Sequence, residues 1–422
     1  MKHVILGNGP AGVVAAETIR KHAQGDEIVV VGAEPGRPYG RMAIPYLLAG
    51  KIDEAGTLLR KDPHHFDRLR IGLRHGRAAA VDPSARTVTL EDGSVLPFDR
   101  LLVATGSVPL RPPIPGIDLP GVETCWTLED ARRIAALARP GARVVQMGAG
   151  FIGCIILEAL AARGVQLAVV EMGDRMVPRM MGATAGGMLK RWVERKGVAV
   201  HTSAKVESIA AKDGALEVRI TGGAVLPADL VISATGIQPN VGFLEGSGVA
   251  LGKGVLTDAS CRTNVPEIFA AGDCAEALDP LTGKHVVSGV QPNAADEAAC
   301  AALNMVGRVA RLVAVTQANV LDTLGLISAS FGQWEGVAGG ERAELTDEAH
   351  FRHLRLEFRG DVLVGANVIG LTEHVGVLRG LVEGRVRLGA WKDRLLREPT
   401  RITEAYLAAA QRQEAWARPR PV

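Results

Sequence analysis

A glycine-rich stretch near the start of the chain constrains the fold more than any other part of the sequence. Residues 4–6 suit a short apolar strand, residues 10–21 suit a helix, and residues 28–31 form a second apolar strand. The turn between the first strand and the helix holds a GxGxxG pattern made by Gly7, Gly9 and Gly12. Such glycines permit a sharp turn, close approach of a pyrophosphate to the helix N-terminus, and tight helix–strand packing. The stretch predicts a dinucleotide-binding unit, with a merely tight turn as the alternative.

The residues around these glycines complete the pattern. Pro10 and Ala11 open the predicted helix, and Glu34 follows the second strand. A carboxylate at that strand end can accept hydrogen bonds from an adenosine ribose. Glu34 is therefore a candidate nucleotide-binding residue.

The same pattern recurs from residue 143 onward. Residues 144–147 suit a strand, residues 167–170 suit the next one, and Glu171 follows it. The turn and the helix start between them contain Gly148, Gly150, Phe151, Ile152 and Gly153. Glu171 would bind the ribose 2′-hydroxyl of NADH and repel the 2′-phosphate of NADPH, although the nearby Arg175 could soften that preference.

The duplication extends beyond the glycines. Residues 78–103 alternate as a strand meander, and residues 203–220 form a similar strand-rich insert. Each meander is followed by an Ala-Thr-Gly triplet, namely Ala104, Thr105 and Gly106 in the first unit and Ala234, Thr235 and Gly236 in the second. Two related nucleotide units in one chain are therefore predicted.

Composition limits the other classes of function. A chain of 422 residues favours two or three domains, and a net charge of +2 gives no reason to expect nucleic acid or a membrane as the partner. The five cysteines form no CxxC motif. We therefore expect reduced thiols, no metal site and a location in the cytoplasm.

Taken together, these motifs resemble the pyridine nucleotide-disulfide oxidoreductase superfamily of flavoproteins. The subset that is most similar contains NADH:rubredoxin reductases, ferredoxin reductases and the flavin module of NADH-dependent nitrite reductases. Further matching motifs are Tyr39-Gly40-Arg41, Pro115-Gly116, Pro239-Asn240 and Ile268-Phe269-Ala270-Ala271-Gly272-Asp273. The resemblance implies an α/β fold with two Rossmann-like dinucleotide-binding domains, as in glutathione reductase, and a C-terminal α+β domain.

The resemblance also implies a domain plan and a flavin site. Residues 1–107 and 241–310 would bind FAD, residues 108–240 would bind NADH, and residues 311–422 would form an interface domain ending in a helix at residues 400–416. Besides the residues of the first glycine turn, four residues would contact FAD. They are Arg41, Gly272, Asp273, which would bind the ribityl chain, and Asn293, near the start of a helix aimed at the flavin.

This sequence departs from the family pattern at three positions. Relatives with a redox cysteine beside the flavin carry it where Met42 stands here, so disulfide chemistry is not expected. Electron-transfer relatives often place a lysine at the position of Tyr46 and pair it with a glutamate at the position of Ile155. A buried lysine without its glutamate would be an unpaired charge, so the joint loss is physically consistent. It leaves the seating of the nicotinamide open.

Two functions follow from the resemblance. The first is an FAD-dependent NADH oxidoreductase that passes electrons to a separate acceptor, such as a small electron-transfer protein, a quinone or dioxygen. No side chain is required for acid–base catalysis, and the expected neighbours of the flavin ring are Arg41, Met42 and Tyr46. The second is a flavin-binding subunit of a larger redox complex with a vestigial nicotinamide site. A homodimer remains open in both cases.

Overall fold

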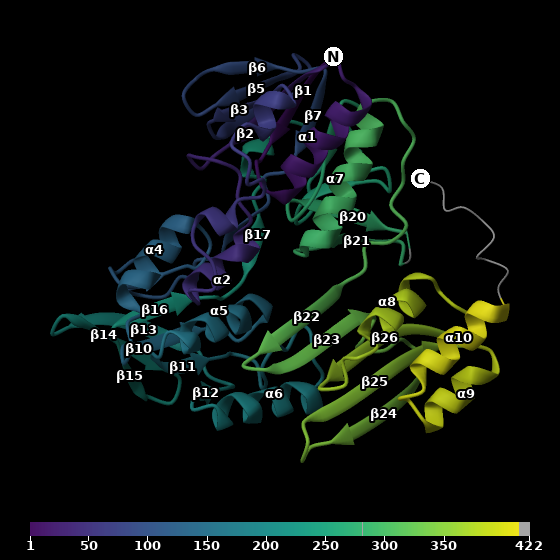
Figure 1. Cartoon of the computed structure of the whole chain (residues 1–422). Coiled ribbons are helices and arrows are strands. Elements are labelled where there is room, and N and C mark those ends of the chain that lie inside the picture. Colours follow the sequence, from purple (N-terminus) through teal and green to yellow (C-terminus); the bar gives the residue numbers. More distant parts are fainter. Residues whose placement is uncertain (281, 413–422) are drawn as a thin grey trace. The chain divides into compact units, whose positions relative to one another are not determined.

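A computed structural model describes residues 1–280 and 282–412 of the chain. The chain forms two compact units, and each is assembled from separated segments. The first unit contains residues 1–110, 126–132 and 236–315, and the second contains residues 111–125, 133–235 and 316–422. Figure 1 labels the helices and strands along the chain.

The first unit is built on a parallel five-stranded sheet. Its apolar strands pair in the order β19-β7-β1-β2-β3, so that the last strand in sequence closes one edge beside β7. In sheet order the bounds are Ile268–Ala270, Arg100–Val103, Lys2–Leu6, Glu27–Gly32 and Ile71–His75. A strand from residue 268 therefore completes a sheet begun at residue 2.

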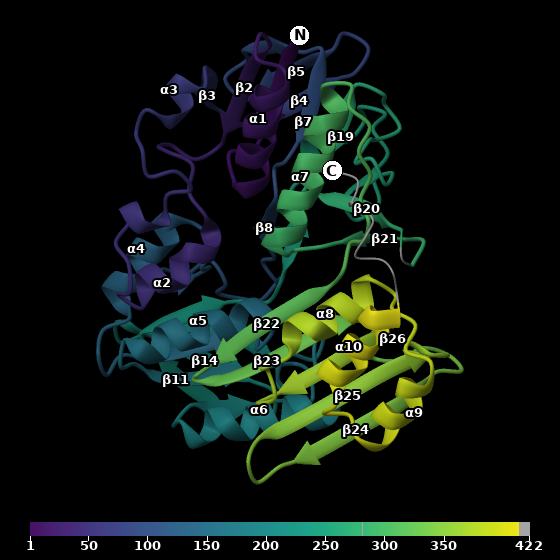
Figure 2. The same cartoon turned by 45° about the vertical axis from the view of Figure 1, so that its right-hand side comes forward.

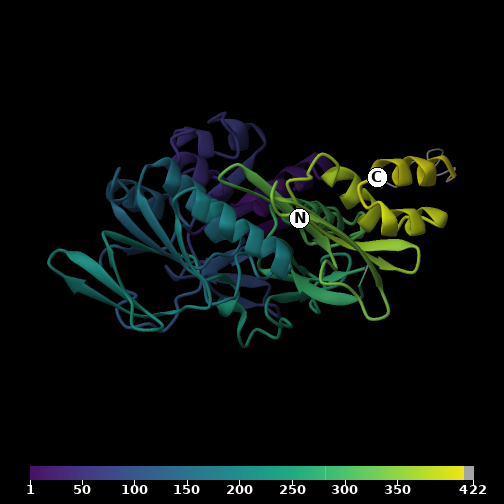
Figure 3. The same ribbon diagram turned by 90° about the horizontal axis from the view of Figure 1, so that it is seen from below.

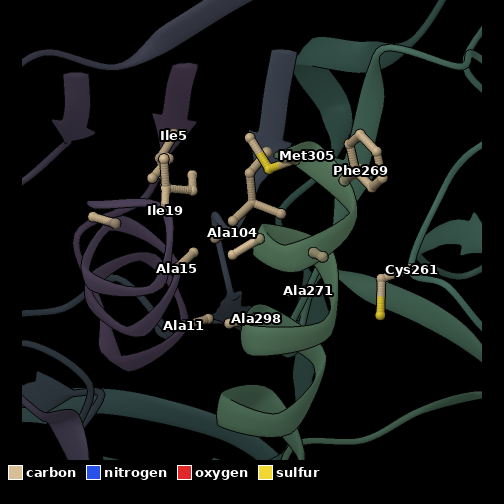
Figure 4. Packing of buried hydrophobic residues seen from close by; sticks show 14 of the residues in the cluster. Ile5, Ala11, Ala15, Ile19, Ala104, Cys261, Phe269, Ala271, Ala298 and Met305 are labelled. Atoms are coloured by element: carbon tan, nitrogen blue, oxygen red, sulfur yellow. The ribbon is translucent and has the colours of Figure 1, made fainter. Parts of the chain in front are cut away.

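Two helices cover one face of this sheet. They are α1 (Pro10–His22) and α7 (Gln291–Met305), and they lie side by side in Figures 1 and 2. Figure 4 shows the small side chains that separate them, including Ala11, Ala15 and Ala298. Small residues let two helix backbones approach closely, while larger side chains such as Phe269 fill the layer next to the strands.

Small antiparallel sheets and short helices complete the first unit. The meander β4-β5-β6 packs its apolar residues on the other face of the main sheet. The meander strands are Ala78–Asp82, Thr87–Leu90 and Val95–Pro97. The remaining elements are η1 (Arg41–Ala43), α2 (Ile44–Leu48), η2 (Ala55–Thr57), α3 (His65–Arg68), β8 (Ser107–Pro109), β17 (Ile237–Pro239), η3 (Gly242–Leu244), β18 (Val255–Thr257), β20 (Ala275–Asp279) and β21 (Lys284–Val287).

The second unit repeats the plan of the first. Its parallel sheet has the order β12-β11-β10-β16-β9, with the bounds Ala199–His201, Gln166–Val170, Arg143–Met147, Leu230–Ser233 and Val122–Glu123. Helix α5 (Phe151–Ala162) follows β10, and helix α6 (Ala183–Arg195) precedes β12. The meander of β13 (Val206–Lys212), β14 (Ala215–Ile220) and β15 (Val225–Ala228) packs on the sheet as its counterpart does. Helix α4 spans Leu128–Leu137, and its residues up to Arg132 belong to the first unit.

The C-terminal part of the second unit is an antiparallel sheet with helices on one face. Its strands pair in the order β22-β23-β26-β25-β24, with the bounds Ala318–Thr323, Leu326–Gly332, Val362–Ile369, Arg352–Arg359 and Glu341–Asp347. The helices are α8 (Val375–Glu383), α9 (Ala390–Arg397) and α10 (Ile402–Arg412), which Figure 3 shows in yellow against the green strands. One face of the strands is apolar and packs on these helices, whereas the other carries buried polar residues such as Ser330 and Asn367.

These observations confirm the predicted fold class. Both strand–turn–helix–strand units and the C-terminal mixture of sheet and helices are present. The division by contacts joins the C-terminal segment to the second unit, and the three-domain plan stays a prediction. The predicted helix at residues 400–416 corresponds to α10, and its last residues lie outside the described part of the chain. Within that described part, every helix is too short or too polar to cross a membrane.

Candidate dinucleotide-binding sites

The first glycine turn leaves no room for a side chain at two of its three glycines. A Cβ on Gly7, whose φ is +117°, would lie 2.0 Å from the carbonyl oxygen of Ala104. A Cβ on Gly12 would lie 1.9 Å from the carbonyl oxygen of Gly7. The turn is also fixed by the Gly7 N–H, which donates to the Val31 carbonyl at 2.8 Å. These two glycines are therefore required by the packing of the turn itself.

Gly9 differs because the space beside it is open. It is the N-cap residue of α1, and a Cβ on it would meet no atom within 4 Å. No side chain caps this helix, so the backbone N–H groups of its first turn have no side-chain acceptor. Free N–H groups at the positive end of a helix beside an open approach fit a pyrophosphate.

Glu34 lies at the predicted strand end and holds the loop that follows it. Its carboxylate accepts the Tyr39 hydroxyl at 2.6 Å and a guanidinium N–H of Arg41 at 2.7 Å. Arg41 also donates to the Trp126 carbonyl at 3.0 Å and lies over the Trp126 ring. Each Glu34 oxygen has one bond of this kind and a second lone pair, so the carboxylate keeps acceptor capacity for a ribose hydroxyl.

The predicted flavin loop at Gly272 brings the starts of two helices together. A Cβ on Gly272, whose φ is +80°, would lie 3.4 Å from the Cβ atoms of both Ala11 and Ala294. The N-terminal ends of α1 and α7 therefore meet at this loop, and their positive dipole ends converge there. Asp273 follows, accepts the Ser107 hydroxyl at 2.7 Å, and has a pKa raised by burial.

A second carboxyl group lies behind this loop and was not predicted from the sequence. Glu297 on α7 is 2% exposed, and its Oε2 accepts the Gly272 N–H at 2.7 Å. Burial raises the pKa of Glu297 to about 8, and the nearby Asp273 charge adds to the rise. A protonated carboxyl at this position needs no cation beside it.

The remaining residues predicted for the first unit are positioned as follows. Thr105 donates its hydroxyl to the Asn240 carbonyl at 2.7 Å, and Gly106 has a φ of +67°. Asn293 is 7% exposed and donates to the Ser288 hydroxyl at 2.8 Å. Among the expected flavin neighbours, Met42 is 48% exposed and Tyr46 is 53% exposed. Their side chains are therefore available to solvent or to a ligand.

The second glycine turn reproduces the first. A Cβ on Gly148 would lie 2.4 Å from the Ala234 carbonyl oxygen, and a Cβ on Gly153 would lie 2.5 Å from the Gly148 carbonyl oxygen. Gly150 caps α5 and has open space beside it, as Gly9 does. Buried Gln146 donates to the carbonyl oxygens of Gly148 and Gly153 at 2.9 and 3.0 Å, a bond set that Ile5 cannot make in the first unit.

Glu171 is bound to backbone groups rather than to side chains. Its two oxygens accept the N–H groups of Ala149 and Gly173, each at 2.7 Å, and the residue is 9% exposed. The sequence position of Arg175 suggests that it could soften the preference against a 2′-phosphate. In the structure, Arg175 donates to the Met181 carbonyl at 2.9 Å and to Asp174 at 2.7 Å, so it is bonded within its own loop.

The other residues predicted for the second unit lie near this turn or follow it. Phe151 and Ile152 begin α5 and are partly exposed, as is Ile155 one turn later. Ala234 donates its N–H to the Met147 carbonyl at 2.8 Å, and the Thr235 and Ser233 hydroxyls lie 3.4 Å apart. Gly236, with a φ of +125°, belongs to the first unit, where its carbonyl accepts the Leu110 N–H.

Several residues of these sites carried no signal in the sequence. They are Asn8, which packs over Gly32, together with Ser107, Trp126, Gln146 and Glu297. Each acts through burial or through a contact that sequence spacing does not reveal, and Asn8 stands at a variable position of the GxGxxG pattern. The one available signal for Gln146 is that it is a polar residue in the otherwise apolar stretch 144–147, directly before the second glycine turn.

Comparisons with known proteins agree with the geometry of the two turns. A family model described as pyridine nucleotide-disulphide oxidoreductase matches residues 1–299. The ferredoxin–NAD(+) reductase component of an anthranilate 1,2-dioxygenase system from Burkholderia cepacia is 33% identical, over 72% of this chain and 75% of the relative.

Two further comparisons extend over nearly the whole chain. The epsilon subunit of NADH-dependent phenylglyoxylate dehydrogenase from Aromatoleum evansii is 29% identical, over 95% of this chain and 96% of the relative. A crystal structure of the covalent putidaredoxin reductase–putidaredoxin complex matches with a TM-score of 0.89 at 24% identity, over 98% of this chain and 99% of the solved chain. The latter likeness shows a shared fold.

Proposed function

This chain belongs to the pyridine nucleotide-disulphide oxidoreductase family and is a flavin-dependent NAD(P)H oxidoreductase, and from this premise we propose that it carries electrons from NADH through FAD to a separate acceptor protein. The observation that carries the proposal is the repeated glycine turn. Gly9 and Gly150 each cap a helix without a side-chain cap and have open space beside them, once in each unit. A chain with two such turns can bind two dinucleotides.

We assign FAD to the first unit. The open helix start at Gly9 would take the pyrophosphate, and Glu34 would accept the adenosine ribose hydroxyls. The converging ends of α1 and α7 would stabilise negative charge near Gly272 and Asp273. Bound FAD supplies the ring that exchanges a hydride with a nicotinamide. The side chains of the unit bind and orient it, with Ser107 holding the Asp273 carboxyl group in place.

We assign NADH to the second unit, with NADPH disfavoured. The Glu171 carboxylate lies at the strand end where a nucleotide ribose binds, and a 2′-phosphate there would meet its negative charge. Arg175, the cation closest in sequence, is bonded to Asp174 and Met181, which supports the proposal that it does not offset Glu171. The relatives named for NADH or NAD(+) support the same preference.

We propose a small electron-transfer protein as the acceptor. The support is the Burkholderia cepacia relative named as a ferredoxin–NAD(+) reductase component. Met42 stands where disulfide-using relatives carry a cysteine, and all five cysteines of this chain are free. Electrons would therefore leave the protein without passing through a disulfide of its own. Location in the cytoplasm stays a prediction.

An anaerobic titration of the purified flavoprotein tests the proposal. NADH is expected to bleach the flavin absorbance at a much lower concentration than NADPH does. The reduced protein should then reduce an added ferredoxin or rubredoxin in a stopped-flow experiment. A flavin that NADH bleaches but that transfers electrons to no one-electron carrier would rule out the acceptor, and a colourless protein that takes up no FAD would rule out the whole proposal.

A second function is favoured by one observation. The relative that covers 95% of this chain is a subunit of a larger enzyme, an NADH-dependent phenylglyoxylate dehydrogenase. This chain would then exchange electrons with a neighbouring polypeptide in a stable complex. Purification from the native source separates the two functions, because only the subunit is expected to elute with stoichiometric partner chains. In a subunit with a vestigial nicotinamide site, the flavin would also stay oxidised in anaerobic NADH.

A further inference from the structure

The segment between β11 and α6, here called loop 172–182, closes over the second glycine turn. The Val177 N–H donates to the carbonyl oxygen of Ala149, a residue of that turn, at 2.8 Å. The Ala149 N–H in turn donates to Glu171, directly before the loop. The backbone of Ala149 is therefore bonded to both Glu171 and Val177, which lie six residues apart in the chain.

Val177 holds this position in an unfavourable backbone conformation. Its φ is +44°, and a β-branched residue rarely adopts a positive φ. Its side chain is 1% exposed, and the neighbouring Met176 and Met181 are fully buried. Such a conformation persists only where the surrounding structure over-determines it, and such positions cluster at ligand-binding sites.

The far end of loop 172–182 is held by one side chain of the C-terminal sheet. Asn367 on β26 donates its Nδ2 to the Met180 carbonyl at 3.0 Å. Its Oδ1 accepts the N–H of Gly182, the N-cap residue of α6, at 2.9 Å. Asn367 is fully buried, so these bonds face no competition from water.

Helix α6 is attached to the same sheet further along. Trp192 donates its indole N–H to the Leu324 carbonyl at 3.2 Å and packs edge-on against Phe351. The helix body is therefore also fixed by contacts other than those of Asn367, and we expect loss of Asn367 to affect mainly the loop that leads into it. Because Trp192 anchors the helix and Asn367 anchors the loop, Asn367 can be substituted while the anchor at Trp192 is kept.

We propose that Asn367 is a positioning residue for the pyridine nucleotide site, because it holds loop 172–182 against the glycine turn at Ala149. The inference rests on the proposed function, which places the nucleotide at this turn. The C-terminal sheet thereby contributes to nucleotide affinity through the loop, without touching the nucleotide at Asn367. Because coupling is reciprocal, a bound nucleotide should also stiffen the loop.

The test is Asn367→Leu, which keeps the branched shape and the number of heavy atoms of the side chain and removes both hydrogen bonds. Calorimetric titration of the oxidised holoenzyme with NAD+ should show about tenfold weaker binding. The KM for NADH should rise similarly, while the FAD content and the kcat with ferricyanide stay near those of the wild type. A purely structural defect would instead lower the FAD content, kcat and affinity together.

The matched control is Ser330→Ala. Ser330 lies opposite Asn367 in the β23–β26 ladder, is equally buried, and has a hydroxyl without a hydrogen-bond partner in the described structure. Its substitution should leave NAD+ affinity unchanged. Equal NAD+ affinity in Asn367→Leu and the wild type would overturn the inference. Failure of the wild type itself to bind NAD+ would overturn the proposed function instead.

Hydrogen exchange in the wild-type holoenzyme keeps the inference testable if Asn367→Leu does not fold. NAD+ is expected to slow amide exchange in peptides from loop 172–182 and from β26, relative to peptides from β24 of the same sheet. Protection at the glycine turn alone, with unchanged exchange in loop 172–182, would show that the loop and Asn367 play no part in binding.

Discussion

The Glu171 carboxylate accepts the backbone N–H of Ala149 at 2.7 Å, so the acid expected to select the nucleotide is also part of the glycine turn. Its counterpart Glu34 instead accepts side-chain donors, the Tyr39 hydroxyl and the Arg41 guanidinium. The two units share a backbone plan but fix their acids differently. In the second unit, the position of the acid and the shape of the turn depend on one another.

Glu171→Gln should weaken both functions of this residue. Glutamine has only one acceptor oxygen, so its NH2 group would face the N–H of Ala149 or of Gly173. That N–H would lose its acceptor, which costs about 1–3 kcal/mol for a buried group. We expect a higher KM for NADH and a smaller ratio of the NADPH KM to the NADH KM, because the repulsion of the 2′-phosphate is lost. The control is Glu194→Gln, which removes an exposed charge from α6 in the same unit. An unchanged ratio in Glu171→Gln would show that another residue selects the nucleotide.

The glycines of the first turn should separate folding from flavin binding. Gly12→Ala would place a methyl group 1.9 Å from the Gly7 carbonyl oxygen and should destabilise the apoprotein by about 3 kcal/mol. Gly9→Ala meets open space and should change apoprotein stability by about 1 kcal/mol or less. It should still lower FAD affinity by about tenfold or more, since the methyl group projects where the pyrophosphate would bind. Thermal unfolding of the apoprotein and fluorescence titration with FAD measure the two effects, and equal FAD affinity in Gly9→Ala would contradict the assignment.

Glu297 should make the protein less stable as the pH rises. Its pKa in the folded protein is about 8, against 4.5 for the free side chain, so the folded state retains a proton that the unfolded state has lost. Stability therefore falls from about pH 4.5 upward, by about 1.4 kcal/mol for each pH unit, and levels off above about pH 8. Glu297→Gln keeps an acceptor for the Gly272 N–H and should remove this slope. Urea unfolding at several pH values measures the free energy of unfolding of both proteins. The same pH dependence in the wild type and in Glu297→Gln would show that Glu297 is ionised in the folded protein.

His3 should act at the acid end of the same profile. It is fully buried in β1, and burial lowers its pKa below 6.5 despite the hydrogen bond to Asp26 at 2.8 Å. The unfolded state thus takes up a proton first, and stability is lost as the pH falls below about 6.5. His3→Gln can still bond to Asp26 but cannot titrate. The free energy of unfolding of this variant, measured with urea, should change less with pH than that of the wild type between about pH 5 and 7. An equal pH dependence in the two proteins would assign the effect to other groups.

The sequence was sufficient for the parts of the fold in which local geometry decides. Only glycine fits at positions 7 and 12, because a Cβ at either would clash with the backbone. The spacing of Gly7 and Gly12 therefore predicts the turn, the helix after it and the strands on both sides. The acid after the second strand follows from the same plan. The repeat at Gly148 then predicts the second unit by the same reasoning.

The sequence was insufficient where a contact joins distant segments. The neutral state of Glu297 depends on its burial behind Gly272, which sequence spacing does not reveal. Arg175 lies four residues after Glu171, but its bonds go to Asp174 and Met181 within its own loop, which sequence spacing does not reveal. Asn367 binds a loop nearly two hundred residues earlier in the chain, and a lone buried asparagine in a strand has no recognisable pattern.

The pairing of β19 with β7 constrains the order in which the chain can fold during its synthesis. A ribosome must release more than 260 residues before the edge of the first sheet exists, and α7 emerges later still. Until then the nascent chain exposes the apolar edge of β7 and one flank of α1, surfaces that invite aggregation or a chaperone. Residues 133–235, which hold the second glycine turn and most of its parallel sheet, are translated within that interval, so this sheet can form before the first one receives its last strand.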